Sequence, residues 1–153
     1  MFAEFFYKAK TLFGAELFDH LKGWDDSLQD FNPNFCRFPM LLAVAFGIAG
    51  LVFVLYYYVL NHPRVNRWWH WVVTLITVAG VSWLYGHYVV TMDIAYGNVA
   101  PSLQPRIGGL NAMQFGFYEM GLSVIFYFVL TLTLRRWSRN CKHSPWKILI
   151  RKK

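Results

Sequence analysis

The stretch MLLAVAFGIAGLVFVLYYYVL, residues 40–60, decides the fold because it contains no charged side chain. At about 1.5 Å per residue, a helix of this length spans roughly 31 Å, the thickness of the hydrocarbon core of a bilayer. Two similar stretches follow: residues 71–92, interrupted by His87, and residues 115–134, interrupted by Glu119. The sequence therefore predicts an all-α integral membrane protein with three transmembrane helices.

Composition agrees with this prediction, since the 153 residues are 56% hydrophobic and only 15% charged, unlike a soluble domain of this size.

We divide the chain into three parts. Residues 1–38 form an amphipathic outer-face helix and linker, residues 39–134 form the transmembrane domain, and residues 135–153 form a basic cytoplasmic tail. The bacterial inner membrane is the predicted location, from the small size of the chain and a start that lacks the pattern of a signal peptide.

The net charge of +7 is concentrated in the tail, which holds eight of the fifteen basic residues and no acidic one. These residues are Arg135, Arg136, Arg139, Lys142, Lys147, Arg151, Lys152 and Lys153. A basic block directly after an apolar run is typical of a cytoplasmic anchor on anionic lipid, and not of a segment that binds nucleic acid. Arg64 and Arg67 lie on the same predicted side, so we expect the N-terminus outside and the C-terminus in the cytoplasm.

Apolar side chains recur at a helical period along residues 1–33. They are Phe2, Phe5, Phe6, Phe13, Leu17, Leu21, Trp24, Leu28 and Phe31. This pattern predicts an amphipathic helix at the membrane interface, with Gly14 and Gly23 as places where it could break. Its other face carries six acidic and three basic residues, which suits the outer surface or a protein partner better than anionic lipid. The alternative is a lid packed on the bundle of its own chain.

Two ionisable residues inside the predicted spans are the main candidates for a functional site. His87 and Glu119 should lie at similar depth on neighbouring antiparallel helices, where they could form a hydrogen bond or an ion pair. Polar and small side chains mark what we expect to be the facing stripes of the two helices. They are Thr77, Gly80 and Thr91 on the second helix, and Gly116, Ser123, Tyr127 and Thr131 on the third. Two interpretations stay open: a site that handles protons or cations, and a polar contact that holds the helices together.

Small residues indicate close contacts between helices, because they let backbones approach. Ala43, Gly47 and Gly50 lie on the first span, and Ser82 and Gly86 on the second.

The sequence contains no enzymatic motif, and we expect no cofactor and no bound metal. Cys36 and Cys141 should lie on opposite sides of the membrane as unpaired thiols. We expect a non-enzymatic subunit of a larger envelope or secretion-type membrane assembly, with other membrane subunits or further copies as partners. The alternative is a homo-oligomeric proton or ion channel, or a membrane-permeabilising effector.

Overall fold

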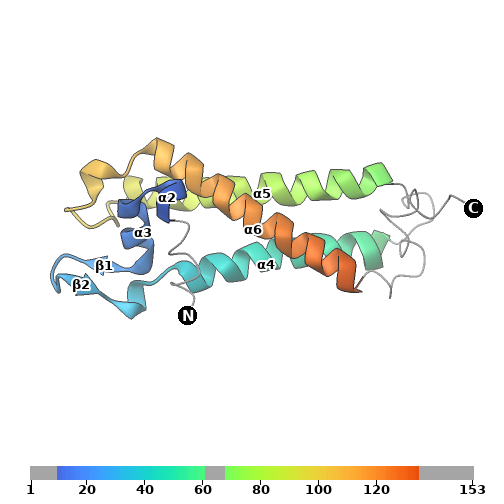
Figure 1. Cartoon of the computed structure of the whole chain (residues 1–153), viewed down its shortest axis with the longest axis horizontal. Coiled ribbons are helices and arrows are strands. Elements are labelled where there is room, and N and C mark those ends of the chain that lie inside the picture. Colours follow the sequence, from blue (N-terminus) through green and yellow to red (C-terminus); the bar gives the residue numbers. More distant parts are fainter. Residues whose placement is uncertain (1–9, 61–67, 135–153) are drawn as a thin grey trace, which may run out of the picture.

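The structure, a computed structural model, describes residues 10–60 and 68–134. Its body consists of α4 (Phe38–Val54), continued by the π-helical segment η2 (Leu55–Leu60), α5 (Trp68–Ala95) and α6 (Gly109–Leu134). The short elements are α2 (Lys10–Phe13), α3 (Ala15–Lys22), β1 (Trp24–Asp25), β2 (Asp30–Phe31) and the 3-10 turns η1 (Pro33–Phe35) and η4 (Gln104–Arg106). Figure 1 shows these short elements gathered at one end of the bundle, beside the loop that joins α5 to α6. We call this end the head and define it as residues 10–37 and 96–108.

The three predicted helices are confirmed, since α4 with η2, α5 and α6 are each long and apolar enough to span a membrane. Two of them are longer than the apolar runs suggest: α5 begins at Trp68, and α6 begins at Gly109. The first turn of α6 is fixed by Asn111, whose Oδ1 accepts the N–H of Gly108 at 3.0 Å. Its Nδ2 donates to the carbonyl of Phe13 at 3.0 Å, so the head anchors the added turns.

The amphipathic helix predicted over residues 1–33 is interrupted at Gly14 and Gly23, the two places where the sequence allowed a break. Gly14 and Gly23 adopt φ angles of 99° and 96°, which ends α3 on both sides, because other residues rarely adopt this conformation. Residues 24–31 then form an antiparallel hairpin in which Trp24 pairs with Phe31. The rings of this pair lie 5.3 Å apart, edge to face, whereas Leu28 at the turn is 62% exposed. The predicted Phe2, Phe5 and Phe6 lie outside the described residues.

The apolar face of the head packs on the three long helices. Phe13, Leu17 and Leu21 are fully buried in a cluster with side chains of all three. Members from the helices include Leu41 and Ala45 of α4, Val90 of α5, and Ala112 and Phe115 of α6. The described part of the N-terminal segment is thus placed as a lid on its own bundle.

The opposite end of the bundle is closed by aromatic side chains. Tyr56 and Tyr57 of η2 are buried there with Tyr127 of α6. The hydroxyl of Tyr58 donates to the carbonyl of Leu134 at 3.2 Å. The indole of Trp71 donates to the Thr131 hydroxyl at 3.5 Å. The tyrosines that end the first span and the tryptophans that open the second therefore lie at the same end, as an aromatic belt requires.

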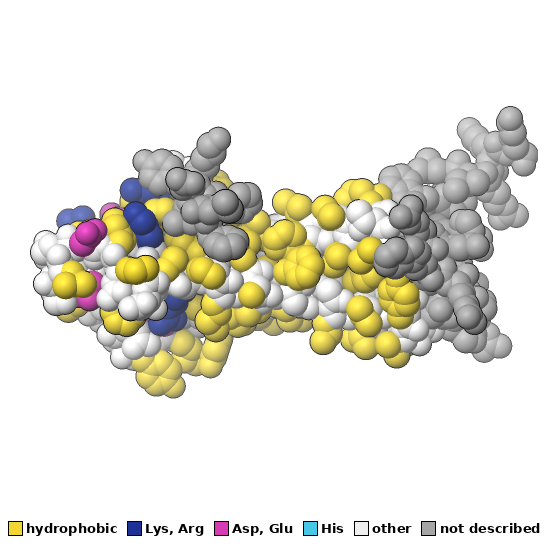
Figure 2. All heavy atoms as spheres, turned by 90° about the horizontal axis from the view of Figure 1, so that it is seen from below, with side chains coloured by type: hydrophobic (Ala, Val, Ile, Leu, Met, Phe, Trp, Pro, Cys, Tyr) yellow, Lys and Arg dark blue, Asp and Glu magenta, His cyan; other side chains and the backbone are white. Residues whose placement is uncertain are grey.

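Charge is divided sharply between the head and the long helices. Figure 2 shows charged side chains gathered at the head end and apolar side chains along the helices on the face in view. Among the Lys, Arg, Asp and Glu residues that the structure describes, all but Glu119 lie in the head or, like Asp93, are bonded to it. The helices thus present apolar surfaces outward and keep Glu119 inside, away from the head.

Candidate functional site

The candidate site lies where α5 and α6 pack closely together at Gly86 and Gly116. A Cβ atom built on Gly86 would lie 3.0 Å from Cβ of Glu119 and 3.1 Å from Cα of Gly116. A Cβ atom built on Gly116 would lie 2.9 Å from the carbonyl oxygen of Trp83. Neither glycine could carry a side chain without moving a backbone, so both are needed for this contact. The structure places the predicted packing residues Ser82 and Gly86 inside the bundle, where both are buried.

Five polar side chains have buried atoms with no hydrogen-bond partner among the described residues; one is His70, near the start of α5, and the other four lie at this contact. These four are Ser82 and Trp83 of α5, and Glu119 and Ser123 of α6. Ser82, Glu119 and Ser123 are each fully buried, and both carboxyl oxygens of Glu119 are unpartnered. Ser82 lies one helical turn from Gly86, and Ser123 one turn from Glu119, in the same direction along the antiparallel pair. The two hydroxyls and the carboxyl group therefore belong to one short stretch of the seam between the helices.

Further from the head, hydrogen bonds join polar side chains of α5 and α6 along the same seam. The hydroxyls of Thr74 and Tyr127 lie 2.6 Å apart, and Thr74 also donates to the carbonyl of Trp71 at 2.7 Å. Because a threonine hydroxyl has one hydrogen, Tyr127 is the donor to Thr74. Gly116, Glu119, Ser123, Tyr127 and Thr131, the predicted stripe on the third helix, are all buried. This half of the predicted seam is present in the structure.

The predicted stripe on the second helix is not the face that meets α6. Thr77 and Thr91 are exposed and donate to the carbonyls of Val73 and His87 in their own helix. Gly80 is open, with no atom within 4 Å of where its Cβ would be. A hydroxyl bonded to its own helix can face lipid at little cost, so polarity alone does not identify the inner face. Ser82 and Gly86 mark that face instead.

His87 does not bond Glu119 in the structure, since neither carboxyl oxygen has a partner among the described residues. Its imidazole stacks on the indole of Trp83, with ring centres 5.5 Å apart. It lines a shallow apolar cleft on α5 with Leu84, Tyr85, Tyr88 and Thr91. Trp83 thus stands between His87 and the contact at Gly116. The predicted Glu–His pair is replaced by a carboxyl group beside two serine hydroxyls.

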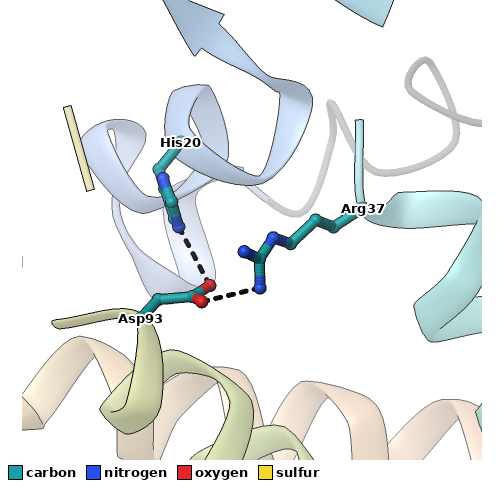
Figure 3. A network of polar contacts seen from close by, with 3 residues as sticks. All are labelled: His20, Arg37 and Asp93. Carbon is teal, nitrogen blue, oxygen red and sulfur yellow. Dashed lines mark hydrogen bonds and ion pairs between the residues drawn. The ribbon is translucent and has the colours of Figure 1, made fainter. Parts of the chain in front are cut away.

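A second polar cluster, which the sequence analysis did not find, joins the head to the bundle. The Asp93 carboxylate lies 2.6 Å from Nη1 of Arg37 and 3.1 Å from Nε2 of His20 (Figure 3). Asp93 is nearly fully buried, with 4% of its side chain exposed. Its backbone carbonyl also accepts the N–H of Asn98 in the outer loop. Arg37 directly precedes the first long helix, and Asp93 lies near the end of the second. Both residues therefore lie at the same end of the bundle, and this position in the sequence could have predicted their contact.

An open cleft of about 670 Å³ lies beside this cluster, between the hairpin, η1 and the outer loop. Asp26 at its edge accepts hydrogen bonds from Ser102, at 2.5 Å from Oγ and 3.0 Å from N. These bonds hold the pKa of Asp26 below its ordinary value, and the bond from the Ser102 hydroxyl has the larger effect. The Ser27 hydroxyl and N–H likewise lower the pKa of Asp25. The hairpin is therefore fastened to the loop through the Asp26 carboxylate, whereas the Asp25 bonds stay within the hairpin. Cys36, a free thiol, also lines the cleft.

The predicted basic residues of the tail, together with Arg64, Arg67 and Cys141, lie outside the described residues. Comparison with protein-family models, with curated proteins and with solved structures finds no match for this chain. Its function must therefore be argued from its own surfaces and sites.

Proposed function

We propose that the chain is an integral membrane protein that serves as a non-enzymatic subunit of a larger membrane assembly in the bacterial inner membrane. Its N-terminus and head lie outside, and its basic tail lies at the cytoplasmic surface. The division between a charged head and long apolar helices supports insertion, because buried charge is costly in hydrocarbon. The eight basic residues of the tail, against four basic residues in the head, support the orientation.

One observation carries the proposed role in an assembly: no residue that the structure describes covers the small-residue face of α4 at Gly47 and Gly50. Ala43 and Gly47 are exposed, and no atom lies within 4 Å of a Cβ built on Gly47 or Gly50. Gly86 and Gly116 show what such residues do when covered, since a Cβ atom built on either would lie about 3 Å from atoms of the neighbouring helix. A membrane helix of another chain can approach the α4 face in the same way.

The mass of the protein purified in mild detergent tests this proposal. The wild type should run as a multiple of the 18.0 kDa chain or with other membrane proteins, and Gly47→Leu or Gly50→Leu should release the single chain. Gly80→Leu is the matched control: Gly80 is equally open, but Ile76 and Leu84, one turn away on either side, are bulky. A wild-type mass of one chain, or an unchanged mass in both α4 variants, would remove the support for an assembly.

Fusions with a reporter that is active only in the cytoplasm test the orientation. A reporter placed after Lys153 should be active, and one inserted beside Gln104 in the outer loop should be silent. The reverse pattern would overturn the proposed orientation while leaving the assembly test unaffected.

The alternative function, a proton or cation channel, is supported by one specific observation, the unpartnered carboxyl group of Glu119. His87 adds no support, because it stacks on Trp83 and forms no bond with Glu119.

A further inference from the structure

The carboxyl group of Glu119 has no neutralising partner in the described part of the chain. It is fully buried in α6, and no ion pair joins it to any described Lys, Arg or His. The titratable groups that interact with it electrostatically are the phenols of Tyr85 and Tyr118, which are uncharged at neutral pH. An isolated carboxylate in such a site costs far more free energy than one helix contact returns.

The space around this carboxyl group is limited by the close approach of the two helices. Gly86 meets the Glu119 stem without a side chain, which holds the group between the backbones of α5 and α6. The unpartnered hydroxyls of Ser82 and Ser123 lie one turn further along the same seam. A hydroxyl can both donate and accept, so either serine can bond the carbonyl or the O–H of a carboxylic acid after a rotation of its side chain.

We propose that Glu119, with the hydroxyls of Ser82 and Ser123, forms a proton-binding site inside the membrane, occupied by a proton when α5 and α6 are packed as described. The proton neutralises the carboxyl group, and the acid O–H then donates to a serine oxygen. Loss of the proton leaves a buried carboxylate between two helices, which favours separation at the Gly86 and Gly116 contact or entry of water.

The local chemistry favours a proton over a metal cation. Hard cations such as Ca²⁺ or Mg²⁺ take about six or more oxygen ligands, whereas one carboxylate and two hydroxyls provide at most four. The fourth unpartnered group at this contact, Nε1 of Trp83, is only a donor and cannot bind a cation. Binding of a proton needs just one acceptor oxygen. This inference requires the packed seam and membrane insertion, and it does not require the proposed assembly.

Infrared spectroscopy of the full chain in lipid bilayers at neutral pH tests the proposal directly, because it needs no reagent to reach the site. We expect the carbonyl band of a protonated carboxyl group, lost in full in Glu119→Gln. Glu119→Asp, which keeps an acid, should retain a band at a shifted frequency and serves if the glutamine variant does not fold. Ser82→Ala and Ser123→Ala should shift the wild-type band by removing hydrogen-bond partners, whereas the open Gly80→Ala should not.

Three results would overturn the proposal. Absence of the band in the wild type would show that Glu119 is ionised. A band that disappears when sodium or lithium is added at constant pH would identify a metal-cation site. A band that neither serine variant shifts would exclude the serines from the site. All three are read from the spectrum, and the assembly test is read from the mass, so failure of one proposal is distinguishable from failure of the other.

Discussion

Arg37→Gln should loosen the head much more than Asp93→Asn does, although both remove the same ion pair. Without Arg37, the Asp93 carboxylate stays buried, with 4% of its side chain exposed and His20 as its remaining partner. Leaving a buried charge without its partner costs about 3 kcal/mol or more. Without the Asp93 charge, Arg37, at 35% exposed, can turn to water, and the new amide still accepts a hydrogen bond. That change should cost about 1 kcal/mol.

Amide hydrogen exchange of residues 15–22 measures the opening of the head. The estimated costs correspond to exchange about 140-fold faster in Arg37→Gln and about 5-fold faster in Asp93→Asn. Exchange in the middle of α6 is the internal reference. Arg106→Gln is the matched control, because this exposed arginine forms no ion pair among the described residues. Equal effects of the two variants, or a larger effect of Asp93→Asn, would refute the reasoning that the buried carboxylate dominates the cluster.

Other substitutions test the seam and the hairpin. Gly86→Leu should destabilise the bundle by about 1–3 kcal/mol in detergent melting, since its Cβ would meet the α6 backbone at 3.1 Å, whereas Gly80→Leu, with open space, should not. Tyr127→Phe should cost about 0.6–1.7 kcal/mol in the same assay by removing the donor to Thr74. Because the pKa of Asp26 is lowered in the folded chain, its contribution is present above the ordinary carboxyl pKa of about 3.9 and is lost as pH falls through the lowered value. Acid should therefore speed exchange in the hairpin of the wild type, relative to intrinsic rates, more than in Asp26→Asn, and no difference would contradict this.

The three long helices could be predicted because uncharged runs of this length have few other solutions. Their ends could not, since the first turn of α6 depends on Asn111 and its bond to Phe13, far away in the sequence. In the N-terminal segment, helix and hairpin share one pattern. Residues seven apart, such as Trp24 and Phe31, lie on one face of a helix, and the same two residues are directly opposite in this hairpin. Only Gly23 distinguishes the two structures locally, by ending α3.

The periodicity of polar and apolar residues also did not predict how α5 is rotated about its axis, that is, which of its faces meets α6. Two stripes on this helix carry small or polar residues, one through Thr77 and His87 and one through Ser82 and Gly86. Intrahelical hydrogen bonds satisfy the threonines, so the first stripe could turn outward. The second turned inward because Gly86 has no Cβ, which at this position would lie only 3.1 Å from Cα of Gly116. Helix packing, and not polarity, therefore decided which residues Glu119 meets.

The lid has a consequence for how the protein is made. Phe13 bonds Asn111 across 98 residues, and its ring packs against Phe115 at 5.3 Å. The ribosome synthesises the lid first, but its binding surface on α6 is synthesised last. The apolar side of the lid therefore cannot complete its packing until the third helix has been inserted, and until then it stays exposed or is bound by another protein. A ribosome stalled before α6 would leave two long apolar helices and an N-terminal segment whose apolar side chains are exposed. Such a product would be a substrate for quality-control proteolysis.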